Sequence, residues 1–185
     1  MNEKDIFPIL EGLGWRCKED EVGDHYCLMD VGCAQVQVIP SVGVRSDHYR
    51  VSFMPSVSIA RFTAAVSFFL GGGEVSDHVP IVVSNIPPEK IASFSVADVV
   101  RLSQKSISWA SAQDIDAGLA VYMALTSNSK GAMPLRHLAA LALARDVSCF
   151  VRYQRSFEQG DRLGFVPYIY PEMIDRALQL AQSSE

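Results

Sequence analysis

The sequence contains no close cysteine pair, no long apolar run and no secretion signal. Its four cysteines form no C-x-x-C pair, so a zinc site of the usual finger or ribbon type is not expected. The longest uncharged apolar stretches, 64–70 and 138–144, are far shorter than the about 18 residues that a membrane helix needs. The first residues lack the basic and apolar regions of a signal peptide. We therefore expect a cytoplasmic protein with free thiols that does not bind membranes.

Motifs for phosphate binding and nucleophilic catalysis are also missing. The chain has no P-loop, no G-x-G-x-x-G run and no G-x-S-x-G elbow, so no nucleotide or other cofactor is predicted. The glycine run 71–73 follows a helical apolar pattern and is typical of a helix end. Asp114 and Asp116 are two residues apart, which on a helix turns their side chains about 200° from each other. The motifs therefore identify no catalytic residue.

Acidic residues are concentrated in the first half of the chain. Residues 1–94 hold 7 Lys/Arg and 12 Asp/Glu, a balance of −5, whereas residues 95–185 hold nine of each. Such a charge distribution disfavours nucleic acid and attracts a basic protein. Part of the excess falls in one short segment, which supplies the candidate partner-binding residues Glu19, Asp20, Glu21 and Asp24.

Alternating apolar residues predict antiparallel strands over about residues 25–54. A two-residue turn at 32–33 aligns three apolar pairs on one face, Val31 with Ala34, Met29 with Val36 and Cys27 with Val38. A second turn at 45–48 aligns Val44 with Tyr49 and Val42 with Val51. Pro40 predicts a bend or bulge. We expect a three-stranded meander, with a fourth strand at 79–83.

Apolar residues at helical spacing predict helices before and after these strands. Helices are expected at 3–13 and 59–70, the second with Ser56 or Ser58 as its N-cap, and helix starts at Ser95, Ser111, Pro134 and Pro171. Residues 147–157 fit a helix or an alternating strand, and we favour a helix. A break at 87–88 separates a sheet subdomain, 1–92, from a helical subdomain, 93–185, within one continuous folded unit. The expected class is α+β: an N-terminal helix, a three- to four-stranded antiparallel meander with a packed helix, and a mainly helical second half.

Three Asp-His pairs precede apolar runs, at 24–25, 47–48 and 77–78. The predicted register separates His25 from His48 by about five residues, or ~16 Å along the strands, plus two strand spacings. Metal–imidazole bonds are only about 2.0–2.1 Å long, so these two rings cannot share a metal. Cys33 cannot complete a site with His25 and Cys27, because the turn lies ~20 Å along the strand from Cys27. His78 has no predicted position, so an arrangement of two histidines stays open.

The order of helix, three-stranded antiparallel meander, helix and further strand resembles the small α/β fold of type III secretion chaperones. The resemblance covers about the first 85 residues and is carried by the runs 6–13, 26–31, 34–44, 49–54 and 59–70. It implies an acidic, cytoplasmic, dimeric protein that binds its partner in extended form. The mostly helical residues that follow are an addition to that fold.

These observations favour a non-catalytic bacterial protein-binding module that sequesters or neutralises a partner protein, of the toxin-immunity or secretion-chaperone type. The expected partner is another protein, basic in character, and neither a nucleic acid nor a membrane. Two alternatives stay open. One is a small-molecule enzyme or sensor with a pocket between sheet and helices, in which His25 or His78 acts as acid or base. The other is a structural subunit that forms a homodimer.

Overall fold

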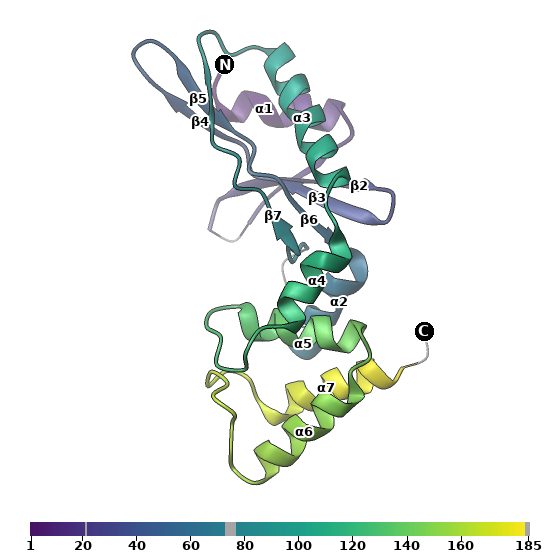
Figure 1. Cartoon of the computed structure of the whole chain (residues 1–185). Helices are drawn as coiled ribbons and strands as arrows, with labels where there is room; N and C mark the ends of the chain where they lie inside the picture. The colour runs from purple at the N-terminus through teal and green to yellow at the C-terminus, as the bar shows by residue number, and fades with distance from the viewer. Residues whose placement is uncertain (21, 73–76, 184–185) are drawn as a thin grey trace. The chain divides into compact units, whose positions relative to one another are not determined.

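The computed structural model describes residues 1–20, 22–72 and 77–183, which fold into two compact units (Figure 1). Unit 1 comprises Met1–Ile59 and Pro80–Gln113, and unit 2 comprises Ala60–Val79 and Asp114–Glu185. The chain therefore passes between the units three times, whereas the sequence suggested one boundary at 92–93. Helix α2 (Ala60–Phe69) belongs with the helices of unit 2, and helix α3 (Val96–Ser111) belongs with the strands of unit 1.

The first sheet of unit 1 is antiparallel, in the order β1-β2-β3-β6-β7. Its strands are β1 (Arg16–Glu19), β2 (His25–Val31), β3 (Ala34–Val38), β6 (Ser56–Ile59) and β7 (Val82–Val83). The predicted register of the β2–β3 hairpin is confirmed at all three apolar pairs. Gly32 adopts φ +61°, a left-handed conformation that the two-residue turn requires. Ser56 and Ser58, expected to cap a helix, instead lie in the fully buried strand β6.

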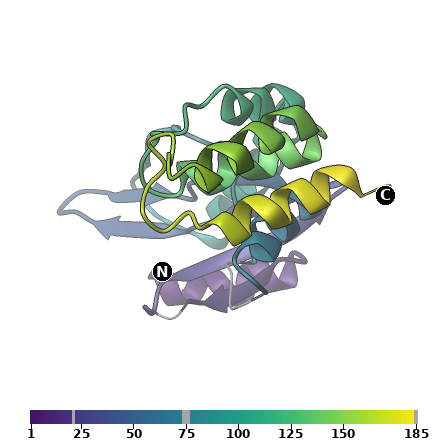
Figure 2. The same cartoon turned by 90° about the horizontal axis from the view of Figure 1, so that it is seen from below.

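A second antiparallel sheet in unit 1 has the order β4-β5-β8, with β4 (Ser41–Val44), β5 (Tyr49–Ser52) and β8 (Glu89–Ile91). The predicted pairs Val44–Tyr49 and Val42–Val51 are confirmed. The strands do not continue as one meander, because β3 pairs with β6 and the chain breaks at Pro40 before β4 begins. Figures 1 and 2 show the β4–β5 hairpin extending away from the strands of the first sheet.

The predicted helix starts at Ser95, Pro134 and Pro171 agree with the structure to within one residue, whereas Ser111, predicted to start a helix, is the last residue of α3. Ser95 and Asp98 form a reciprocal capping box at α3, and the Asp114 side chain accepts a hydrogen bond from Ala117 N at the start of α4 (Ile115–Met123). Residues 147–157 are helical. The remaining helices are α1 (Ile6–Gly12), preceded by a 3-10 turn at Glu3–Asp5, and α5 (Met133–Leu143), α6 (Val147–Glu158) and α7 (Pro171–Gln182). The α+β class and the helical second half are therefore confirmed.

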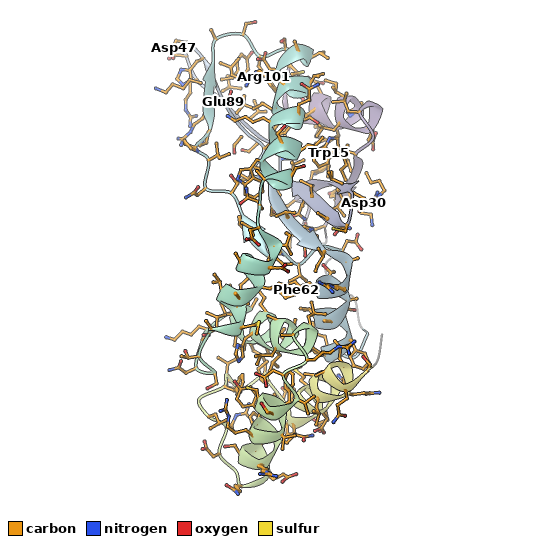
Figure 3. All side chains as sticks on the ribbon, turned by 45° about the vertical axis from the view of Figure 1, so that its right-hand side comes forward. Trp15, Asp30, Asp47, Phe62, Glu89 and Arg101 are labelled. Atoms are coloured by element: carbon orange, nitrogen blue, oxygen red, sulfur yellow. A yellow bond between two sulfur atoms is a disulfide. The ribbon has the colours of Figure 1, made fainter. Side chains whose placement is uncertain are left out.

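Each unit has its own apolar core. In unit 1, helices α1 and α3 contact each other, and Trp15 Nε1 donates a hydrogen bond to Ser103 Oγ at 2.8 Å. In unit 2, Phe62 stacks on Tyr122 with ring centroids 5.8 Å apart. Figure 3 labels Trp15 and Phe62 in the two cores. No helix among the described residues is long and apolar enough to cross a membrane.

Candidate functional site

A disulfide joins Cys17 of β1 to Cys27 of β2, where the two residues face each other in the ladder. The expectation of free thiols is therefore wrong for this pair, whereas Cys33 and Cys149 are free. The bond also removes Cys27 as a thiolate ligand for the zinc site considered with His25. Since disulfides persist mainly in oxidising compartments, the free-thiol argument no longer supports a cytoplasmic location, which stays a prediction.

Each of the two histidines in unit 1 has a local partner of its own. The His25 ring stacks on Phe7 of α1 with centroids 4.7 Å apart, and its Nε2 lies 3.8 Å from a Glu19 carboxylate oxygen. His48 Nδ1 lies 2.7 Å from Asp47 Oδ1 in the β4–β5 turn, and this hydrogen bond lowers the pKa of Asp47. Within the described residues, no three His, Cys, Asp or Glu side chains are grouped so that they could hold a metal ion.

The other two histidines are buried in unit 2. Burial, followed by the positive charge of Arg136, lowers the pKa of His78 to about 4, so His78 is neutral at pH 7. His137 Nδ1 donates to the Tyr122 carbonyl, and its Nε2 accepts from the Tyr153 hydroxyl, both at 2.9 Å. These partners satisfy both ring nitrogens of His137, as a buried polar side chain in a core requires. Sequence reasoning did not single out His137, because it lies within an apolar helical run.

Cys149 lies in the first turn of α6 and has charged and polar neighbours that the sequence did not suggest. Arg152 Nη2 lies 3.3 Å from its sulfur, and Asp146 Oδ1 accepts a hydrogen bond from its backbone nitrogen at 3.0 Å. The residue is only 8% exposed. The polar contacts of this thiol thus lie inside the fold, where a substrate does not reach it without local opening.

The acidic segment between β1 and β2 forms a turn held together by Asp20. Asp20 Oδ1 accepts hydrogen bonds from the backbone nitrogens of Val22 and Asp24, at 3.0 and 2.8 Å. This carboxylate is therefore engaged in shaping the turn. Glu19 and Asp24 are exposed, while Glu21 lies outside the described residues. The three predicted partner-binding residues that the structure describes, Glu19, Asp20 and Asp24, lie close together in this turn. Their contact with a partner stays a prediction.

A small pocket that opens to solvent, with a cavity volume of about 30 Å³, lies within unit 1. It is lined mainly by the end of β5, by the segment before β8 and by α3, and its polar rim includes Lys105 and Glu89. Glu89 is already paired, at 2.5 Å to Lys105 Nζ and at 2.8 Å to Arg101 Nη1. Figure 3 shows Glu89 and Arg101 close together at this site. Neither His25 nor His78 lines the pocket, so neither proposed acid/base residue is placed to act on a ligand there.

The second sheet carries a row of cations on its solvent face. Arg50 of β5 lies directly opposite Lys90 of β8 and, on its other side, opposite Gly43 of β4. Arg45 lies over Gly43, with Nη2 3.8 Å from where a Cβ on that glycine would be. Arg45, Arg50 and Lys90 are exposed, and no acidic side chain of the described residues pairs with Arg50 or Lys90. We call Arg45, Arg50 and Lys90 the cationic row.

Strand β4 forms one edge of the same sheet, and its outer side has no neighbouring strand among the described residues. In the turn, Arg45 N donates a hydrogen bond to His48 O at 2.9 Å, so these two residues form a hydrogen-bonded pair. Hydrogen-bonded and non-hydrogen-bonded pairs alternate along an antiparallel ladder, so this pair determines which residues of β4 bond to β5. Gly43 consequently exchanges backbone hydrogen bonds with Arg50, while the backbone groups of Val42 and Val44 point outward. Val44 is 65% exposed, and its carbonyl accepts a hydrogen bond from the Arg45 guanidinium at 3.2 Å.

Comparison with known proteins gives a family and no function. No curated protein matches this chain, and no solved structure matches it. The model of a family of unknown function, DUF6990, matches residues 2–182 and so spans both units. The chain therefore belongs to the DUF6990 family.

Proposed function

We propose that this chain is a non-catalytic protein-binding module that holds a partner protein. The observation that carries the proposal is the open edge of β4, on a hairpin that extends from unit 1. An open edge offers backbone donors and acceptors to another chain, and natural proteins usually protect such edges. Here the outward groups of Val42 and Val44 lie on a strand with no charged residue within it.

The positions of the histidine and cysteine side chains that could act in catalysis favour a binding role over an enzymatic one. His25 and His48 have partners within their own turns, and His137 has both ring nitrogens satisfied in the core. His78 and Cys149 are buried. Catalytic groups have to reach the substrate, so these placements favour structural roles for the five side chains.

The unit that carries the open edge also carries two surfaces of opposite charge. The acidic turn presents Glu19 and Asp24, and the second sheet presents the cationic row. Charged surfaces of this kind increase association rates and select among partners more than they add affinity. Sequestration of a toxin or of a secreted protein, as the sequence suggested, is one biological form of such binding.

The test is reconstitution of a complex. The tagged full-length chain is purified from its native host, any bound protein is identified, and the pair is reassembled from purified components. A complex of defined stoichiometry by sedimentation and calorimetry supports the proposal. Recovery of the chain with no protein, together with a metabolite that stabilises it in a thermal-shift screen, would contradict the proposal in favour of a sensor or enzyme. A stable homodimer with no other partner would favour the structural subunit instead.

A further inference from the structure

We propose that β4 binds an extended segment of its partner in which acidic and apolar residues alternate, added as a fourth strand to the β4-β5-β8 sheet. This inference rests on the proposed function and specifies the chemistry of the partner. It is built from three features of the second sheet: its open edge, its alternating faces and the cationic row.

The backbone of β4 determines how the segment attaches. In the antiparallel ladder with β5, every second residue of β4 points its N–H and C=O groups away from β5. Because Arg45 hydrogen-bonds to His48 in the turn, the residues of β4 whose backbone groups point outward are Val42 and Val44. An incoming strand therefore finds donors and acceptors at these two residues. The Arg45 guanidinium, which donates to the Val44 carbonyl at 3.2 Å, has to move away when the strand adds.

The two faces of the sheet determine which side chains the segment carries. On one face lie Val42, Val44 and Val51, and Val51 is only 1% exposed because this face packs onto the core. On the opposite face lie Gly43, Arg50 and Lys90. Side chains of an added strand alternate between the same two faces. The segment thus places apolar residues beside the valines and its other residues beside the cationic row.

The positive charge of the cationic row favours acidic residues at the positions of the segment that lie beside it. Arg50 points its backbone groups toward Gly43, so its pairing with Lys90 is of the non-hydrogen-bonded type, in which side chains are closest. Two like charges opposite each other destabilise a sheet. An acidic strand beside β4 relieves this repulsion, and since Gly43 has no side chain, carboxylates can approach Arg45 and Arg50 across it. A second copy of β4 would instead bring a second cationic row to the same face.

The test uses the purified full-length chain and a short, terminally blocked, fluorescent peptide in which Val and Glu alternate. One control peptide has Lys in place of Glu, and another has the same residues in an order that does not alternate. Fluorescence anisotropy at low salt is expected to show about tenfold tighter binding of the alternating Val/Glu peptide than of either control. Its affinity is expected to fall as salt is added, since the carboxylates face exposed cations.

Two variants separate the backbone contribution from the charge contribution. Val44→Pro removes an outward N–H that no strand of this sheet uses, and should weaken binding about tenfold, whereas Val44→Thr keeps the N–H and should bind as the wild type does. The double variant Arg50→Glu, Lys90→Glu should reverse the peptide preference, so that it binds the Val/Lys peptide more tightly than the Val/Glu peptide. That gain of binding also shows that the variant is folded.

Three results would overturn the inference. They are equal binding of the Val/Glu and Val/Lys peptides by the wild type, unchanged binding by Val44→Pro, and a homodimer in sedimentation that Val44→Pro dissociates. If the peptide result is negative while the reconstituted complex forms, the inference is wrong and the proposed function stands. If the peptide binds as described but the chain holds no partner protein in its native host, the preference of β4 for such strands stands, whereas the proposed function, and with it the assignment of the strand to a partner protein, is wrong.

Discussion

Arg50 and Lys90 lie directly opposite each other on neighbouring strands, on the solvent-facing side of the second sheet, with no acidic residue of the described chain paired to either. Such a pair is unfavourable for the free protein, because two cations are held at a close cross-strand position. A sheet selected only for stability would place a carboxylate at one of the two positions. The arrangement is consistent with a surface that gains stability when an anionic segment binds.

The first prediction is that replacing one of these cations stabilises the protein. Lys90→Glu creates an opposite-charge pair with Arg50, and the free energy of unfolding should rise by about 0.5 kcal/mol at low salt. Urea denaturation monitored by circular dichroism measures this change, with Lys90→Gln as an intermediate control. The gain should shrink in high salt. A Lys90→Glu protein less stable than the wild type would show that the pair is not repulsive.

The second prediction concerns the Cys17–Cys27 disulfide, which closes a loop that contains the acidic turn. Constraining a loop of this size should contribute about 2–3 kcal/mol to the free energy of unfolding, mainly by restricting the unfolded chain. Urea denaturation with and without dithiothreitol tests this, and Cys33→Ser serves as a control that keeps the bond. Equal urea midpoints under the two conditions would mean that the disulfide does not form in solution or does not stabilise the fold.

The third prediction is a pH dependence from His78, whose pKa is lowered to about 4 by burial and then by Arg136. Since the folded pKa lies below the unfolded value of about 6.5, the unfolded state binds the proton first, and stability falls as pH decreases from 6.5 toward 4. The loss should approach about 3 kcal/mol at the lower end of this window.

Urea denaturation at pH 7.5 and pH 5 measures this loss, with His78→Gln as the comparison protein. The His137 pKa is also lowered by burial, so both proteins should lose some stability, but the wild type should lose more. Equal losses in the two proteins would mean that His78 is protonated as easily in the folded as in the unfolded state.

The fourth prediction concerns association rates. Replacing Glu19, Glu21 and Asp24 with Lys should slow association with the reconstituted partner by about tenfold at low salt, with little difference at high salt. Asp20 is left unchanged because its side chain holds the turn together. Replacement of Glu3, Glu11 and Asp116 with Lys, at exposed positions outside the turn, controls for net charge. Equal on-rates for the two triple variants would remove the acidic turn from the binding surface.

Much of the fold could be predicted because its patterns are local. The spacing of Cys27, Met29 and Val31, each two residues from the next and matched by Ala34, Val36 and Val38, predicted both the strand and its register across the turn at Gly32. Side-chain caps marked the helix starts, as at Ser95 and Asp98. Strand β1 was missed because Arg16–Glu19 is a polar edge strand, and with it the partner of Cys27 was missed.

The candidate site could not be predicted, because it depends on strands distant in sequence. Arg50 and Lys90 are separated by 40 positions along the chain, and β8 is a three-residue strand, Glu89–Ile91, with no apolar alternation. The second sheet arises because β6 occupies the place beside β3 that the meander would have given to residues 49–54. The open edge follows from that pairing, which is a property of the tertiary structure.

Backbone amide exchange at Val42 and Val44 tests the central claim most directly. In the free protein both amides face solvent on an edge strand and should exchange rapidly. When the reconstituted partner is bound, both should slow by about tenfold or more, because the added strand hydrogen-bonds them. A partner that binds tightly while the exchange of these two amides stays unchanged would show that β4 is not the binding edge.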